Sequence, residues 1–90
     1  MEERKFYEFV KKQVAAYANA HLDKTDGKTI SEDDVFIVWM CKTLQNSKAL
    51  ASTTLFDGMY YEVTFNGDKQ EAYFDAYKKW DNIAIPLKEE

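Results

Sequence analysis

Residues 34–77 hold most of the aromatic and β-branched side chains of this chain, and this stretch constrains the fold more than any other. Such residues favour a pleated, half-buried surface, so the stretch is typical of β-strands. Polar turn signals divide it into four runs, at Gln45-Asn46-Ser47, at Asp57-Gly58 and at Asn66-Gly67-Asp68. Connections this short join antiparallel neighbours. We therefore predict a four-stranded antiparallel β-meander, with strands over residues 35–44, 49–55, 59–65 and 69–77.

The residues before this stretch predict one helix over residues 2–22. Its large side chains recur at spacings of three and four and so share one face, which carries Phe6, Phe9, Val10, Val14, Tyr17 and His21. Alanines between positions 15 and 20 add helix propensity. One helix packed on an antiparallel sheet is an α+β fold, and 90 residues indicate a single domain, residues 1–90.

The first predicted strand is apolar on both faces. Strict alternation divides its large side chains into two sets, Phe36, Val38, Met40 and Leu44 on one face and Val35, Ile37 and Trp39 on the other. A single helix covers one side of a sheet, so the uncovered set needs another partner. We predict a homodimer with Phe36, Val38, Met40 and Leu44 in its interface. Trp39, in the middle of the run, is expected to be buried.

The C-terminal residues offer an alternative cover for this strand. Ile83, Ile85 and Leu87 could fold back over it, although three large apolar groups cover little area. Residues 83–85 also have the composition of a short edge strand, which Pro86 would end because proline has no N–H to donate to the ladder.

The last two predicted strands alternate between apolar and polar residues. An even-length loop after Phe65 keeps the carboxylates of Glu71 and Asp75 off the apolar face, where burying unpaired charge is costly. The opposite face then carries tyrosines among acids: Tyr60, Glu62, Glu71, Tyr73, Asp75 and Tyr77. Tyrosine is enriched in protein interfaces, so we predict that this face binds a partner protein.

Composition and motifs argue against several functional classes. A formal net charge of -4 argues against nucleic-acid binding, which needs a basic patch. The sequence has no glycine-rich phosphate loop and no readable Ser-His or Cys-His pair, so we predict no catalytic residues, no enzymatic activity and no cofactor. The longest apolar run, residues 35–41, is too short to span a bilayer, and no signal peptide is readable, so we expect a cytoplasmic protein without a membrane partner.

No metal site is predicted either. Cys41 and His21 are the only residues of their kinds, and this excludes a cysteine-based zinc site or a histidine pair. Residues 23–34 resemble a calcium-binding loop, but Lys28 stands where that loop needs glycine for its sharp turn.

A small-molecule or nucleotide site is the alternative function. Trp39, Tyr61 and Trp80 could stack on a base, with Lys42 or Lys78 reaching a phosphate. The missing glycine loop and the negative charge argue against it. Acidic mimicry of nucleic acid is a third reading, but 16 acidic residues against 12 basic ones are too balanced to favour it.

Three segments together resemble a known family. They are Trp39-Met-Cys-Lys-Thr-Leu-Gln-Asn-Ser-Lys-Ala-Leu, Asp57-Gly-Met-Tyr-Tyr-Glu-Val-Thr-Phe-Asn-Gly-Asp-Lys-Gln-Glu and Tyr77-Lys-Lys-Trp. The sequence resembles small proteins of unknown function carried by phages and prophages of Gram-positive bacteria. This resemblance implies a phage accessory protein that works in the host cytoplasm by binding a host or phage protein. It implies nothing about mechanism.

Overall fold

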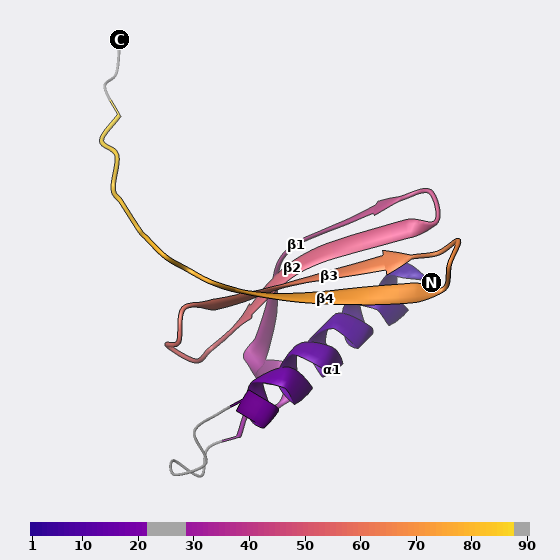
Figure 1. Cartoon of the computed structure of the whole chain (residues 1–90), viewed down its shortest axis with the longest axis horizontal. Helices are drawn as coiled ribbons and strands as arrows, with labels where there is room; N and C mark the ends of the chain where they lie inside the picture. Colours follow the sequence, from indigo (N-terminus) through magenta and orange to yellow (C-terminus); the bar gives the residue numbers. More distant parts are fainter. Residues whose placement is uncertain (22–28, 88–90) are drawn as a thin grey trace.

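The computed structural model describes residues 1–21 and 29–87 (Figure 1). Helix α1 (Glu3–His21) is followed by the short 3-10 helix η2 (Glu32–Asp34) and four strands, β1 (Val35–Thr43), β2 (Asn46–Thr53), β3 (Met59–Asn66) and β4 (Glu71–Lys78). The strands form one antiparallel sheet in the order β1-β2-β3-β4. The predicted α+β fold, one helix on a four-stranded meander, is confirmed.

The element boundaries differ from the prediction mainly at the first turn. Thr43 pairs with Asn46, so the β1–β2 turn consists of residues 44–45 and not of the polar residues 45–47. Leu44 takes a left-handed conformation there, with φ of 56°, and its side chain is exposed. Asn46 and Ser47 belong to the ladder of β2, which therefore starts earlier than predicted.

The β3–β4 turn follows the prediction. Asn66 pairs with Glu71, which leaves an even-length loop of residues 67–70. The backbone amides of Asp68 and Lys69 both donate to Oδ1 of Asn66, at 3.1 Å. The loop thereby keeps the carboxylates of β4 on the face away from the helix.

A β-bulge in β1 overturns the predicted alternation of this strand. Val38 has no partner on β2, because Ile37 pairs with Ala51 and Trp39 with Leu50. One extra residue moves every later side chain of a strand to the other face. The predicted interface set is therefore divided between the two faces of the sheet.

The bulge decides which side chains of β1 are exposed. Met40, predicted for the interface, pairs with the fully buried Ala49 and packs against the core on the helix side. Trp39, predicted to be buried, lies on the face away from the helix with 42% of its surface exposed. The prediction that Trp39 is buried was wrong: it rested on the position of Trp39 in the middle of the apolar run, whereas the bulge turns this side chain to the face away from the helix.

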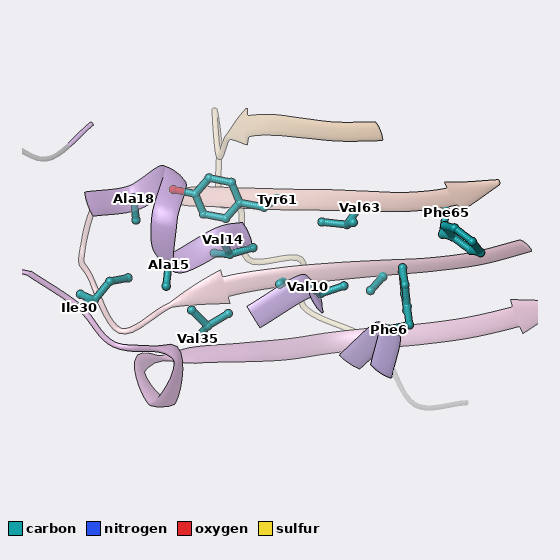
Figure 2. Packing of buried hydrophobic residues seen from close by; sticks show 12 residues of the cluster. Phe6, Val10, Val14, Ala15, Ala18, Ile30, Val35, Tyr61, Val63 and Phe65 are labelled. Carbon is teal, nitrogen blue, oxygen red and sulfur yellow. The ribbon is translucent and has the colours of Figure 1, made fainter. Parts of the chain in front are cut away.

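The hydrophobic core lies between α1 and one face of the sheet (Figure 2). The helix contributes five buried side chains to it: Phe6, Val10, Val14, Ala15 and Ala18. The sheet contributes Val35, Ala49, Ala51, Tyr61, Val63 and Phe65. The small side chains of Ala49 and Ala51 leave room for the helix to approach β2. Of the side chains that sequence periodicity assigned to the buried face of the helix, Phe6, Val10 and Val14 are fully buried.

A pair of hydrogen bonds joins the helix to the segment before β1. The side chain of Asn19 donates from Nδ2 to the carbonyl of Ile30, at 2.9 Å, and its Oδ1 accepts from the Ile30 amide, at 2.8 Å. These bonds satisfy both backbone groups of Ile30 and hold its side chain against the core.

Residues 79–87 form no helix or strand. The amide of Lys79 donates to the carbonyl of Gly58, at 2.7 Å, and this bond extends the β3–β4 pairing by one step. Beyond it the backbone leaves the sheet in an extended course (Figure 1). The predicted edge strand at residues 83–85 is thus wrong, because no neighbouring strand lies beside it.

Burial of Tyr61 gives stability a dependence on alkaline pH. Burial raises the pKa of Tyr61, and the charges of Asp57 and Tyr17 add to this effect. The folded state therefore favours the neutral phenol. Its contribution to stability is fully present below the ordinary tyrosine pKa, about 10, and is lost as the pH rises through the raised value. Tyr61→Phe should weaken this alkaline loss, measured as the urea midpoint at a series of pH values. Identical pH profiles for the two proteins would contradict the prediction.

Candidate binding surface

The face of the sheet opposite α1 is the candidate site, and we call it the open face. Strand pairing aligns its side chains in rows across the sheet. One row runs Trp39, Leu50, Glu62, Asp75, and the next runs Cys41, Lys48, Thr64, Tyr73. On the other side of the Trp39 row, Phe36 pairs with Ser52, and Tyr60 pairs with Tyr77.

The open face has two halves of different chemistry. On β1 and β2, which we call the aromatic half, Phe36, Val38 and Trp39 are each between 42% and 49% exposed. Leu50 lies beside Trp39 and is half-buried. Neighbouring large apolar groups that are exposed together are typical of interaction surfaces, because exposed apolar residues on a monomer usually stand alone.

On β3 and β4, which we call the acid half, tyrosines alternate with carboxylates. The structure brings all six predicted binding residues together here: Tyr60, Glu62, Glu71, Tyr73, Asp75 and Tyr77. Cross-strand register makes Tyr60 and Tyr77 direct neighbours and places Asp75 opposite Glu62. Tyr73 and Tyr77 are exposed, while Tyr60 is half-buried.

Charges on the acid half are only partly compensated. Lys48 on β2 forms an ion pair with Glu62, with 2.9 Å between Nζ and Oε1. The hydrogen bond to Glu62, and then its charge, raise the pKa of Lys48. Among the residues that the structure describes, Asp75 forms no ion pair. Two carboxylates directly opposite each other on neighbouring strands repel, and the Lys48 ammonium, whose pKa the charge of Asp75 also raises, offsets part of this repulsion.

The tyrosines of the acid half make polar and cationic contacts of their own. The hydroxyl of Tyr73 donates to Oε2 of Glu71, at 2.5 Å, and this hydrogen bond raises the pKa of Tyr73. Nζ of Lys79 lies 5.8 Å from the ring centroid of Tyr60. A cation within about 6 Å of an aromatic face is attracted by it, so the Tyr60 ring is placed to accept positive charge.

The predicted dimer interface is assembled only in part. Phe36 and Val38 are exposed as expected, whereas Met40 lies on the helix side and Leu44 lies in the β1–β2 turn. Sequence reasoning missed Trp39 and Leu50 as open-face residues. The small Ala, Ser and Thr residues of β2 gave too weak an alternation to reveal Leu50.

The residues suggested for a nucleotide site are not brought together. Trp39 lies on the open face, Tyr61 lies in the core under the helix, and Trp80 follows β4 outside the sheet. A cavity of about 230 Å³ lies beside Tyr61, between α1 and the β3–β4 strands. Ligand pockets usually measure about 300–1,000 Å³.

Among the described residues there is neither a metal-binding group nor a membrane-spanning helix. Within residues 1–21 and 29–87, no three His, Cys, Asp or Glu side chains form a group that could hold a metal ion. Half of the segment resembling a calcium loop, residues 23–28, lies outside this described part. No described helix combines the length and apolar character needed to cross a membrane.

Fold and surface together define a small α+β protein in which, among the described residues, one helix covers one face of the sheet. Residues 7–87 match the model of a family of unknown function (DUF6275). The chain belongs to this family. Neither the curated proteins nor the solved structures contain a match to it.

Proposed function

We propose that this protein binds another polypeptide through the acid half of its open face, and that the bound segment carries arginine or lysine. The observation that carries the proposal is the pairing of Glu62 with Asp75 on a face that α1 does not cover. Lys48 offsets only part of the repulsion between the two carboxylates, and a further cation from a partner, placed beside Asp75, would offset the rest.

The tyrosines support a basic partner rather than a neutral one. Tyr60 and Tyr77 pair beside the two carboxylates, and Tyr73 lies on their other side. A guanidinium group can pair with a carboxylate and stack on an aromatic ring at the same time. The position of Lys79 beside Tyr60 indicates that the free protein already places a cation on this ring.

Resemblance to phage and prophage proteins supplies the context of the proposal. A phage accessory protein in the host cytoplasm would use this surface on a host or phage protein. The proposed activity is non-enzymatic, and the residues assigned to it are the six of the acid half.

Binding is tested first with a defined probe. A short arginine-rich peptide is titrated into the isotope-labelled protein, and amide shifts are followed by NMR. We expect the largest shifts on β3 and β4, and binding that weakens as salt is added. An acidic peptide of equal length is the matched control. Shifts confined to other elements would contradict the proposal.

Asp75→Asn gives a sharper test, because it should move stability and binding in opposite directions. Removing one of the opposed carboxylates should raise the free energy of unfolding by up to about 1 kcal/mol. It should also weaken peptide binding about tenfold, as loss of a partner charge does in charged interfaces. Asp68→Asn, which changes an exposed carboxylate in the β3–β4 loop, should change neither.

Identification of the natural partner uses the same surface. Tagged protein is used to capture partners from host lysate, alongside a variant with Tyr60, Tyr73 and Tyr77 changed to serine. A partner bound through the acid half should be lost with the triple variant. Capture that is unchanged by it would contradict the proposed site.

A further inference from the structure

We propose that residues 79–87, which we call the arm, dock on the aromatic half of the open face of a second copy, so that two chains exchange arms. The docking surface lies on β1 and β2 and is separate from the acid half. Apolar side chains of the arm would then cover the exposed aromatic residues of the partner copy.

The arm carries large apolar side chains of the kind found in protein interfaces, and these side chains face solvent. Its large side chains are largely exposed: Trp80 by 92%, Ile83 by 71%, Ile85 by 77% and Leu87 by 91%. In an extended backbone the spacing of two places the last three on one side. Figure 1 shows the arm leading away from the sheet where β4 ends.

The radius of gyration of the chain reflects the arm that extends away from the sheet. The radius of gyration is 15.4 Å. A compact domain of this length should have about 12 Å. The difference shows that part of the chain does not pack on the body, and four apolar side chains of that part face water.

Charge indicates which half of the open face the arm fits. Residues 82–87 carry no charged side chain. Phe36, Val38 and Trp39 on the aromatic half are likewise uncharged, whereas the acid half presents Glu62 and Asp75. Covering those carboxylates with apolar residues would desolvate them without compensation. The arm therefore matches the aromatic half.

Geometry favours a second copy over the arm's own sheet. The hydrogen bond from Lys79 to Gly58 fixes the root of the arm in the direction of β4. No turn or bend follows between residues 79 and 87, so the arm does not reverse towards its own open face. Nine extended residues reach about 30 Å, and three strand spacings span about 14 Å, so the arm can cross the sheet of another copy.

The face, and not the sheet edge, is the docking position. The bulge at Val38 interrupts the outer strand β1, and bulges block the addition of further strands. Reciprocal exchange closes a two-fold dimer and leaves no arm free. Four arm side chains and their receptors, at roughly 100 Å² each, bury about 800 Å² per copy, which is the standard size of a stable interface.

Mass measurement tests the dimer. Sedimentation at micromolar concentration should give twice the chain mass of 10.5 kDa. The double variant Ile83→Asp with Ile85→Asp, and Trp39→Lys on the receptor side, should each weaken dimerisation more than tenfold. Phe56→Asp places the same charge at a fully exposed apolar residue outside both surfaces and should keep the dimer. Circular dichroism checks that each variant is folded, since every changed residue is exposed in the single chain.

The single cysteine permits a direct test of exchange. Cys41 is exposed on the open face, so a spin label can be attached to it. The spin-labelled protein is then mixed with isotope-labelled protein that carries Cys41→Ser. If the arms are exchanged, the arm amides of the isotope-labelled copy lie on the open face of the spin-labelled copy. The spin label should then strongly enhance the relaxation of these amides. Relaxation only when spin label and isotope are in the same chain, with a mass of one chain, would overturn the proposal in favour of fold-back. A dimer that survives the double arm variant would overturn it as well.

Discussion

Phe6→Ala should lower the free energy of unfolding by about 3 to 5 kcal/mol, the largest effect expected for a single change in this protein. The Phe6 side chain is 1% exposed. It packs between the start of α1 and the sheet, near Phe65 (Figure 2). Its removal leaves a cavity between α1 and the sheet, which the surrounding side chains close only in part. Domains of this size have only about 5–15 kcal/mol of stability in total.

Thermal and urea denaturation followed by circular dichroism measure this loss. The melting temperature should fall by about 12 °C or more, since 1 kcal/mol corresponds to about 4–8 °C in a domain of this size. The matched control is Tyr7→Ala, which removes the neighbouring aromatic ring of the same helix. Tyr7 is 40% exposed, so its loss should cost far less. Equal losses for the two variants would contradict the assignment of the helix faces.

Gly67→Ala is the second change with a large expected effect. A methyl group at Gly67 would lie 2.1 Å from the carbonyl oxygen of Gln45 and 2.8 Å from its Cβ. The Gly67 amide also donates to Oδ1 of Asn46, at 3.2 Å. The β1–β2 and β3–β4 turns therefore touch at this glycine. The added methyl group must push backbone apart, and overpacking of this kind costs about 1 to 3 kcal/mol.

A second glycine provides the contrast for that experiment. Gly58 has a left-handed φ of 68°, and a methyl group there would meet nothing closer than 3.9 Å. It is needed for its backbone conformation and not for its small size. Asparagine tolerates this conformation, so Gly58→Asn should be milder than Gly67→Ala or Gly67→Asn in urea denaturation. A larger loss of stability for Gly58→Asn than for the Gly67 variants would show that the β1–β2 and β3–β4 turns are not in contact.

Prediction from sequence worked where one physical signal dominated. The helix face followed from the spacing of Phe6, Val10 and Val14, because only one face of α1 meets the sheet. The faces of β3 and β4 followed from the cost of burying carboxylates, which fixed the even-length loop and gathered the acid half on one side. Both signals are properties of single residues at regular spacing.

Prediction failed where neighbours decide the outcome. β1 is apolar at successive positions, so nothing in its sequence marks Val38 as the unpaired residue. Pairing with β2 creates the bulge, and the bulge exchanges the environments of Trp39 and Met40. Residues 83–85 read as a strand from composition alone, but a strand also needs a neighbour to bond with. The homodimer, the partner protein and the cytoplasmic location stay predictions.

The order β1-β2-β3-β4 has a consequence for the kinetics of folding. Every ladder joins strands that are consecutive in the sequence, so each hairpin closes a short loop at small entropic cost. Contacts between α1 and β3, such as that of Tyr17 with Tyr61, span a much longer part of the chain, and such separations slow folding. We therefore expect the hairpins to form early and the docking of α1 to complete the native state. Because α1 is synthesised before the sheet, its apolar face must wait until β1 and β2, the strands it packs on most, have left the ribosome.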